Sequence, residues 1–487
     1  MNLISVRFLL LFLPIVFLVH YVVKPLRMKN IILLMASIVF YACYDVKYVV
    51  FLTLSIALTY FGGLLGRKIK LKHCYMHIIA LMLNFLMLLV FKYEGFVLGS
   101  IGSVLARWGY KIEVPHLLLP VGLSFFIFQS STYLLDLHKG KMQVEKDFLD
   151  YALFVSFFPT ITSGPIQRAR SFLPQVKARS MPSFRKIEEA VLIFLWGAFL
   201  KSVIADRIGV FTDTVYAGYA QYSGWTLFVC ALLYSVQIYA DFSGYSYMAI
   251  AVSKLFGFEL TENFHQPYFA TNIADFWRRW HISLTSWFTE YLYIPLGGNR
   301  KGTARRYINI FIVFLTSGLW HGAGWNFIVW GGIHALYQIA GHLTKPVREG
   351  ICLRLNIDRK KPGYRVGQMA FIYAAAAFAW IFFRAPSLTD ALGYIGRMFS
   401  AWNPWVLFDG TLFSLGLGAA EWNVLIAAVI LMVIVSYIRE RGGNAALLAE
   451  QNLLCKTIVF EVLIIALAIF GMYGEGYSAS AFIYAGF

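Results

Sequence analysis

Six long runs without Asp, Glu, Lys or Arg constrain what this chain can fold into. Each approaches or exceeds the roughly 17–25 residues that cross a hydrocarbon core as a helix. The runs do not alternate apolar and polar residues, as strands of a membrane barrel do. Only 14% of the 487 residues are charged, against about 25% in soluble domains. The sequence therefore predicts an all-α polytopic membrane protein. The runs are residues 48–66, 114–135, 214–240, 307–344, 366–383 and 422–438.

The chain is predicted to form a single integral-membrane domain over residues 1–487. We expect about eleven transmembrane helices, because the loops between apolar segments are too short to fold alone. Residues 1–23 have no cleavage site typical of a signal peptide and are predicted to be the first span.

Two apolar segments are interrupted. Residues 156–171 contain two prolines and a glycine, and residues 239–251 contain Asp241 and Gly244. Irregular backbone survives at membrane depth only where protein buries it or where it lines a cavity. We therefore expect broken backbone in both segments and a re-entrant core.

A third segment, residues 272–306, mixes aromatic and charged residues. Phe276, Trp280, Leu284 and Trp287 recur at helical spacing and are expected to form one apolar face. Tryptophan and arginine together favour the membrane interface. The segment is predicted to be a helix that lies partly in the headgroup layer.

The net charge of +17 is concentrated in short loops between spans. Lys24, Arg27 and Lys29 follow the first span, and a second basic loop follows the next pair of apolar segments. Short basic loops face the cytoplasm. This pattern predicts membrane topology and contact with anionic lipids, and no binding of nucleic acid.

The sequence favours neither a metal site nor a serine nucleophile. No Gly-x-Ser-x-Gly motif or Gly-rich phosphate loop is present. His334 and His342, eight residues apart, are expected to line one helix face without an essential role. The cysteines lack metal-type pairing, so no disulfide framework or zinc site is predicted; they are Cys43, Cys74, Cys230, Cys352 and Cys455.

His321 stands out because it lies inside the uncharged run 307–344, between Trp320 and Gly322. Ionisable residues within spans are rare and costly, so they are candidates for function. Burial disfavours the imidazolium, so His321 is expected to be neutral at pH 7 and able to accept a proton. Two interpretations remain open: a general base, or a histidine that bonds the carbonyl of another helix.

His281 lies 40 positions before His321 and follows Arg278 and Arg279, whose charge favours a neutral ring. Its spacing fits either a chemical role or an interfacial histidine without one. Asp241 is expected to cap a helix, to orient a histidine or to pair with an arginine.

Several segments match a known family. The chain resembles the membrane-bound O-acyltransferase family, in the bacterial polysaccharide branch typified by alginate O-acetyltransferases. The matching text is PVGLSFFIFQSSTYLLDLHKG (120–140), FFPTITSGPIQRA (157–169), YADFSGYSYMAIA (239–251), FWRRWHISLTSWFTEYLYIPLGGNRKG (276–302), SGLWHGAGWNFIVWGGIHA (317–335) and FIYAGF (482–487). The resemblance implies a ring of membrane helices around a thin centre, with a funnel from each face.

The resemblance also implies roles for individual residues. The family's principal catalytic histidine, in its Trp-His-Gly motif, corresponds to His321, with Trp320 as a supporting neighbour. The earlier histidine of its Trp-Arg-Arg-Trp-His motif corresponds to His281. Asp241 falls in the matching Asp-Phe-Ser-Gly-Tyr-Ser element and is expected to have a supporting role.

We therefore expect an acetyl-CoA-dependent O-acetyltransferase in the bacterial inner membrane that serves an exported polysaccharide. Arg278, Arg279 and Arg300 are expected either to hold the phosphates of coenzyme A or only to determine membrane topology. The resemblance implies a partner, an extracytoplasmic acyltransferase of the Ser-Gly-Asn-His (SGNH) hydrolase type. Two alternatives remain: D-alanyl transfer to teichoic acid from a carrier-protein thioester, and a transporter that uses His321 and Asp241 as a proton relay.

Overall fold

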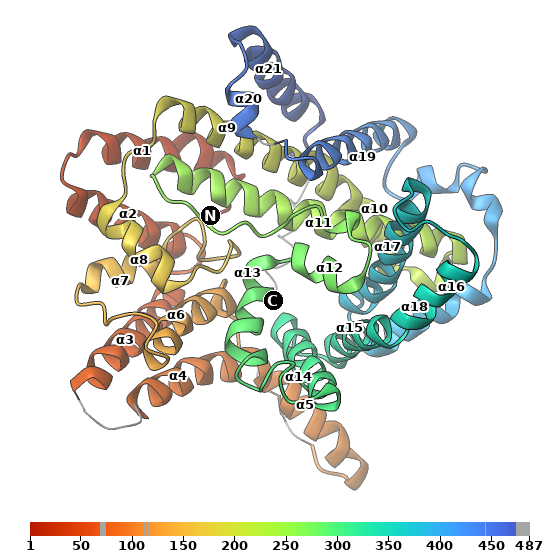
Figure 1. Cartoon of the computed structure of the whole chain (residues 1–487), viewed down its shortest axis with the longest axis horizontal. Coiled ribbons are helices and arrows are strands. Elements are labelled where there is room, and N and C mark those ends of the chain that lie inside the picture. Colours follow the sequence, from red (N-terminus) through yellow and green to blue (C-terminus); the bar gives the residue numbers. More distant parts are fainter. Residues whose placement is uncertain (69–74, 112, 115–116, 444, 474–487) are drawn as a thin grey trace. The chain divides into compact units, whose positions relative to one another are not determined.

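The structure, a computed structural model, describes residues 1–68, 75–111, 113–114, 117–443 and 445–473. Every regular element in these ranges is helical (Figure 1), so the predicted all-α architecture is confirmed. Cys74, the basic residues Lys70 and Lys72, and the matching segment 482–487 lie outside the described residues.

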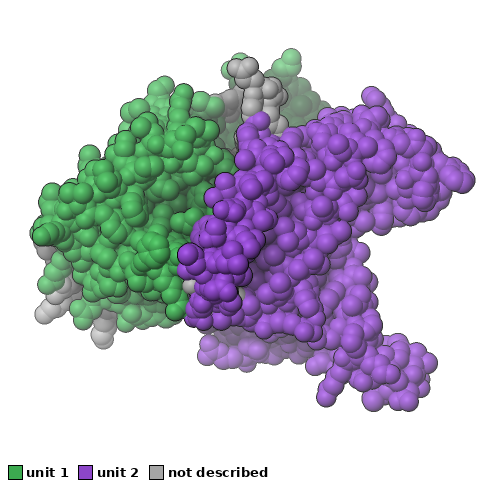
Figure 2. Space-filling view, turned by 90° about the horizontal axis from the view of Figure 1, so that it is seen from above, with its two compact units in different colours: residues 1–195, 245–261, 484–487 green, residues 196–244, 262–483 purple. Residues whose placement is uncertain are grey.

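The chain divides into two compact units, coloured separately in Figure 2. Unit 1 contains the described residues of 1–195 and 245–261, and unit 2 those of 196–244 and 262–483. Two helices belong partly to each unit, α9 (Phe184–Phe199) and α11 (Gly224–Leu255).

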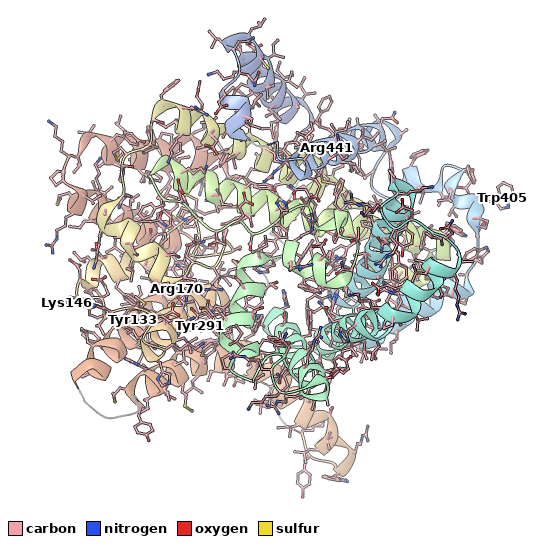
Figure 3. All side chains as sticks on the ribbon, viewed as in Figure 1. Tyr133, Lys146, Arg170, Tyr291, Trp405 and Arg441 are labelled. Carbon is pink, nitrogen blue, oxygen red and sulfur yellow. The ribbon has the colours of Figure 1, made fainter. Side chains whose placement is uncertain are left out.

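Unit 1 is built from the first helices of the chain. They are α1 (Leu13–Val22), α2 (Leu26–Ala42), α3 (Val46–Lys68), α4 (Tyr75–Leu88), α5 (Glu94–Leu105), α6 (Leu123–His138), α7 (Phe148–Ser156) and α8 (Ala169–Ala178). Asp147 begins α7 by accepting hydrogen bonds from the backbone N–H groups of Leu149 and Asp150. Fully buried Asp136 of α6 pairs with Arg170 of α8 at 3.0 Å; Figure 3 labels Arg170.

The connection between α7 and α8 is irregular and buried, as predicted for residues 156–171. Side chains from neighbouring helices satisfy its backbone. The N–H of Phe158 donates to the Ser37 hydroxyl at 3.0 Å, and the N–H of Gln167 donates to Gln129 Oε1 at 3.2 Å. Non-helical backbone is therefore tolerated here because protein groups replace the missing helical bonds.

Unit 2 contains the later helices. They are α10 (Asp206–Ala217), α12 (Ile273–Arg279), α13 (Ile282–Phe288), α14 (Thr303–His321), α15 (Trp325–Leu343), α16 (Lys345–Arg354), α17 (Pro362–Arg384), α18 (Leu388–Ser400), α19 (Ala419–Glu440), α20 (Ala445–Ala449) and α21 (Leu453–Phe470). A π-helical turn, η4 (Leu200–Ala205), joins α9 to α10. The uncharged run 307–344 forms two helices, α14 and α15, rather than one.

Six helical segments of the described chain are long and apolar enough to cross a membrane. They are Val46–Gly66, Tyr75–Trp108, Gly224–Leu255, Pro362–Arg384, Ala419–Glu440 and Leu453–Phe470. The α1 segment, with the preceding π turn, is a shorter apolar helix over Phe8–Val22. The number of about eleven spans stays a prediction.

The expectation of broken backbone at residues 239–251 is wrong. α11 runs through Asp241 and Gly244 as one helix of 32 residues. Asp241 does not break the helix because Lys201 compensates its charge at 2.7 Å. A side-chain carbon at Gly244 would meet the Gly197 carbonyl oxygen of α9, so glycine serves close helix packing and not a turn.

The prediction of one interfacial helix within residues 272–306 is also wrong. The segment forms two helices of seven residues, α12 and α13, with a break at Trp280 and His281. The residues of the expected apolar face are buried, with Phe276 and Leu284 0% and 2% exposed, but they lie on two helices and do not form one helical face. The helix breaks because His281 adopts φ +45° and ψ +52°, outside the right-handed helical region.

Candidate active site

His321 is the last residue of α14, and glycines shape the turn that follows it. Gly322 is extended, and a side-chain carbon there would overlap the Phe327 ring of α15. Gly318 and Gly331 likewise face backbone carbonyls across the α14–α15 contact. The two helices therefore approach closely and carry His321 into the interior, where it is 1% exposed.

The hydrogen bond of His321 fixes which nitrogen carries the proton. Its Nδ1 lies 2.7 Å from the backbone oxygen of Ser317, one turn earlier in α14. A carbonyl oxygen only accepts, so Nδ1–H must be the donor. The lone pair of the neutral ring is then on Nε2, which is the atom that a general base requires.

Aromatic rings wall the His321 side chain. The ring centroids of Trp320 and Trp330 both lie 4.9 Å from the His321 centroid, and that of Phe383 lies 5.4 Å away. All three aromatic side chains are buried, with Trp320 3% exposed. These walls exclude water and disfavour a permanent imidazolium at this site.

His281 lies at the break between α12 and α13. α12 begins at a capping residue, Asn272, whose side chain accepts from the N–H of Asp275 at 2.9 Å. Its last turn ends at Trp280, and the left-handed backbone of His281 then starts α13 in a new direction. The turn buries the His281 ring, which is 1% exposed.

Asn263 orients the His281 ring. Its Oδ1 accepts from the Ser283 N–H at 3.2 Å and from the Ser283 hydroxyl at 2.8 Å. The same oxygen lies 3.1 Å from His281 Nδ1, so Nδ1 is the donor in this pair. The lone pair of His281 is therefore also on Nε2. Sequence reasoning missed Asn263, which carries no motif and lies 18 positions upstream.

The two histidines lie side by side. Their ring centroids are 6.5 Å apart, and the Trp320 ring is 6.0 Å from that of His281. The fold thus brings together His321, His281 and Trp320, which the sequence singled out 40 positions apart. A hydroxyl group carries one proton, so one of the two Nε2 lone pairs can accept it from the reacting hydroxyl while the other accepts from a second donor.

Asp241 belongs to a separate buried ion cluster. Lys201 of η4 lies 2.7 Å from a carboxylate oxygen of Asp241 and 2.7 Å from one of Asp206. The three side chains are at most 4% exposed. Sequence reasoning missed Lys201, and Asp241 pairs with this lysine and not with the arginine that was one expectation.

The ion cluster is linked to the histidines through α11. Phe242, the residue after Asp241, packs edge-on against the His281 ring at 4.6 Å between centroids. Tyr239, one turn earlier, lies 6.2 Å from the Trp280 ring. Asp241 therefore holds the part of α11 that supports His281.

The three arginines assigned to the donor have different environments. Arg279 is tied to Asp275 at 3.0 Å and to Glu440 at 2.7 Å, with its side chain 19% exposed. Arg278 is 72% exposed and 3.5 Å from Asp275. Arg300 is exposed in the turn before α14. Arg278 and Arg300 are accessible to a ligand, whereas Arg279 is held in a structural network.

The two histidines of α15, His334 and His342, form hydrogen bonds and ring contacts with neighbouring side chains. His334 Nδ1 accepts from Trp277 Nε1–H at 3.3 Å, and its ring lies 5.0 Å from the Trp330 ring. His342 bonds Tyr307 and Arg306 at 2.8 and 3.0 Å. In the described part of the chain, no group of three His, Cys, Asp or Glu side chains is placed to hold a metal ion.

Comparisons with known proteins identify the family of the chain. The model of the membrane-bound O-acyltransferase family matches residues 143–366, a range that includes both histidines. The Pseudomonas putida protein "Probable alginate O-acetylase AlgI" is 36% identical over 400 residues, 81% of this chain and 79% of that protein. The Helicobacter pylori "Peptidoglycan O-acetyltransferase" is 36% identical over 428 residues, 80% of this chain and 78% of its own. The Bacillus subtilis "Teichoic acid D-alanyltransferase" is 29% identical over 240 residues, 46% and 59% of the two chains.

Proposed function

Because this multi-pass chain belongs to the membrane-bound O-acyltransferase family, we propose that it moves acetyl groups from cytoplasmic acetyl-CoA to a hydroxyl acceptor. The acetyl group then decorates an exported cell-surface polysaccharide. The relatives named for alginate and peptidoglycan acetylation support this substrate class. We further propose that residues 1–487 act as one domain in a bacterial inner membrane.

One observation carries the mechanism: the Nδ1–H of His321 donates to Ser317 O and leaves the lone pair on Nε2. Nε2 removes the proton of the acceptor hydroxyl as its oxygen attacks the thioester carbonyl. A C–O bond forms, the C–S bond breaks, and the proton passes from Nε2 to the leaving thiolate. General-base catalysis of this kind contributes about 10²–10⁴-fold.

His281 is proposed to position the acceptor. The Nε2 lone pair of His281 is proposed to lie in the same site as that of His321, because the two ring centroids are 6.5 Å apart. The reacting hydroxyl donates its one proton to His321, so His281 Nε2 orients the acceptor molecule by accepting from a second donor on it. Asp241 and Trp320 are proposed to support this geometry and do not exchange protons with substrate.

The acyl donor is proposed to meet the exposed arginines. Arg278 and Arg300 are available to the phosphates of coenzyme A, and guanidinium groups match phosphate geometry. Arg279 contributes indirectly, because its partners Asp275 and Glu440 fix the end of α12.

Two alternative functions make different predictions. D-alanyl transfer has support from the teichoic acid relative, but that likeness covers less of the chain at lower identity. A carrier-protein thioester would then replace acetyl-CoA as donor. A proton-coupled transporter would need Asp241 in a proton relay, whereas Asp241 is held by Lys201.

The decisive experiment supplies purified protein with labelled acetyl-CoA and follows the release of coenzyme A. We expect release that depends on His321. D-alanyl-loaded carrier protein serves as the competing donor. If the protein turns over the carrier thioester and does not turn over acetyl-CoA, the acetyl assignment is refuted.

The second experiment concerns the acceptor. The loops between the spans are short, so a bulky polymer has difficulty reaching a histidine that is 1% exposed. We propose that an extracytoplasmic acyltransferase of the SGNH-hydrolase type receives the acetyl group and modifies the polymer. The purified chain alone should acetylate no polysaccharide, and addition of such a partner should restore modification. Robust acetylation of polymer without any partner would disprove this division of labour.

A further inference from the structure

Unit 1 contains a polar pocket whose lining residues belong to none of the matching motifs. Its volume is about 600 Å³, within the roughly 300–1,000 Å³ of ligand sites. The pocket is formed by the end of α8, the α8–α9 connection, the start of α9, the end of α11 and the residues that follow it, including Arg179, Met181, Lys186, Lys254 and Glu259. Every lining residue belongs to unit 1.

Two of the cations at this pocket are neutralised by carboxylates. Lys186 lies 3.2 Å from Glu259, and Lys254 lies 2.7 Å from Glu189. These pairs are exposed or half-exposed and of the kind that contributes little to stability. The net charge at the pocket therefore depends on the remaining basic groups.

Lys29 is a buried cation and Arg179 a half-buried one, and neither has such an ion pair. No carboxylate of the described residues lies within 4 Å of either group. Lys29 is 7% exposed, and its Nζ contacts the Met181 sulfur at 3.1 Å, directly behind the pocket wall. Its other cation contact is the Tyr21 ring at 6.0 Å.

Arg179 is held by neutral groups. Its guanidinium donates to Asn30 Oδ1 at 2.6 Å and to the Phe256 backbone oxygen at 3.0 Å, and lies 4.3 Å from the Phe258 ring centre. Its Nη2 is buried without a hydrogen-bond partner among the described residues. Burial lowers the pKa of Arg179 to about 10, an effect that Asp150 offsets only in part.

A buried or half-buried cation with no carboxylate in contact is costly, so Lys29 and Arg179 beside a polar pocket favour an anionic ligand. We propose that this pocket binds a phosphate group, with Arg179 as hydrogen-bond donor and Lys29 as the second positive charge beneath Met181. Guanidinium groups pair with phosphate oxygens through parallel hydrogen bonds, which explains the choice of arginine on the wall.

Two sources supply phosphate on this side of the protein. The basic loop that ends at Lys29 is predicted to face the cytoplasm, where both soluble phosphate esters and anionic lipid headgroups occur. The chemistry of recognition is the same for both. The site lies in unit 1 and does not depend on the histidines of unit 2, so its test does not require acetyl transfer.

The experiment measures thermal unfolding of the purified full chain with three probes. Pyrophosphate and glycerol 3-phosphate are titrated in detergent at constant ionic strength, and phosphatidylglycerol nanodiscs are compared with phosphatidylcholine nanodiscs. A phosphate that binds the native state raises the unfolding temperature. Arg179→Gln and Lys29→Met should raise the half-saturating concentration by about 10–100-fold, as expected for a lost charge-assisted hydrogen bond.

Lys177→Met is the matched control. It removes one positive charge from the same region, but Lys177 pairs with Glu145 at 2.7 Å and does not line the pocket. It should bind the probes as the wild type does. Ligand-free Lys29→Met should unfold at or above the wild-type temperature, because it removes a buried unpaired charge while keeping the side-chain volume.

Each result decides the proposal. Stabilisation by the soluble probes, lost in Arg179→Gln, assigns the site to a soluble phosphate ester. Stabilisation by phosphatidylglycerol alone, lost in the same variant, assigns it to a lipid headgroup. If no probe stabilises the wild type, or if all stabilise Arg179→Gln and Lys29→Met equally well, the pocket is not a phosphate site.

Discussion

Two buried clusters in unit 2 surround an ionisable side chain with opposite kinds of groups, apolar rings in one and charged carboxylates in the other. His321 is surrounded by aromatic rings, and its Nδ1–H donates to the backbone carbonyl of Ser317. Lys201 is held between Asp206 and Asp241, each at 2.7 Å. A neutral imidazole in apolar walls can gain and lose a proton, whereas an ammonium between two carboxylates is kept charged. Burial of an ionisable side chain therefore does not by itself show that the side chain is catalytic. The groups that contact it distinguish a catalytic role from a structural one.

The sharpest way to break this comparison is to replace His321. His321→Gln supplies an amide that can form hydrogen bonds near the Nε2 position but cannot take a proton. Acetyl transfer should fall by about 10²–10⁴-fold, while the unfolding temperature stays near that of the wild type. Release of coenzyme A and thermal unfolding are measured on the same preparation. A His321→Gln enzyme that turns over normally would remove His321 from the chemistry.

The opposite outcome is expected at the ion cluster. Lys201→Met leaves two buried carboxylates facing each other and should destabilise the fold by about 3–5 kcal/mol. Denaturant unfolding measures this loss, and activity per folded molecule should change little by comparison.

A triple variant sharpens the test. Lys201→Met combined with Asp206→Asn and Asp241→Asn removes every charge of the cluster and should recover most of the lost stability. If Lys201→Met unfolds like the wild type, or if the triple variant is no more stable than Lys201→Met, the cluster is not the structural support described here.

Asn263 offers a smaller and more specific test. Asn263→Ala removes the acceptor that holds His281 Nδ1–H and should lower transfer by about 10-fold, the value of one hydrogen bond. Asn263→Asp retains an acceptor oxygen and should keep more activity than Asn263→Ala. Donor binding measured separately should stay unchanged in both. Equal activity of both variants with the wild type would show that His281 needs no such orientation.

The smallest effects are expected at the neighbouring arginines. Arg278→Gln should weaken binding of acetyl-CoA, and added salt should weaken wild-type binding in the same direction. Arg279→Gln should instead lower stability by about 1 kcal/mol, because it loses pairs with Asp275 and Glu440. Titration of donor and thermal unfolding separate the two. Donor binding unaffected by Arg278→Gln would leave that arginine as a determinant of topology.

The sequence predicted the parts of the fold that depend on composition alone. Runs 48–66, 366–383 and 422–438 became α3, α17 and α19, because an apolar segment of this length satisfies its backbone only as a helix. The sequence wrongly predicted a break within residues 239–251, where α11 is continuous. The prediction failed because the ion-pair partner of Asp241 is a lysine 40 positions earlier. A tertiary ion pair of this kind leaves no local signal.

The candidate site was visible only in part. His321 and Trp320 were found because a histidine in an uncharged run is conspicuous. Asn263 and the carbonyl of Ser317 were not, because polar contacts made by a loop or by backbone have no pattern of their own. The break at His281 was missed for the same reason, as histidine is seldom left-handed and the apolar spacing continues across it.

Because His281 has a left-handed backbone, selection for folding and selection for activity favour different sets of residues at position 281. Glycine adopts φ +45° freely, whereas other residues incur about 1–2 kcal/mol there. Glycine would relieve this backbone but would lose the buried ring and its bond to Asn263. A library randomised at this position and sorted for folded protein should therefore return both glycine and histidine. The same library sorted for acetyl transfer should return histidine alone.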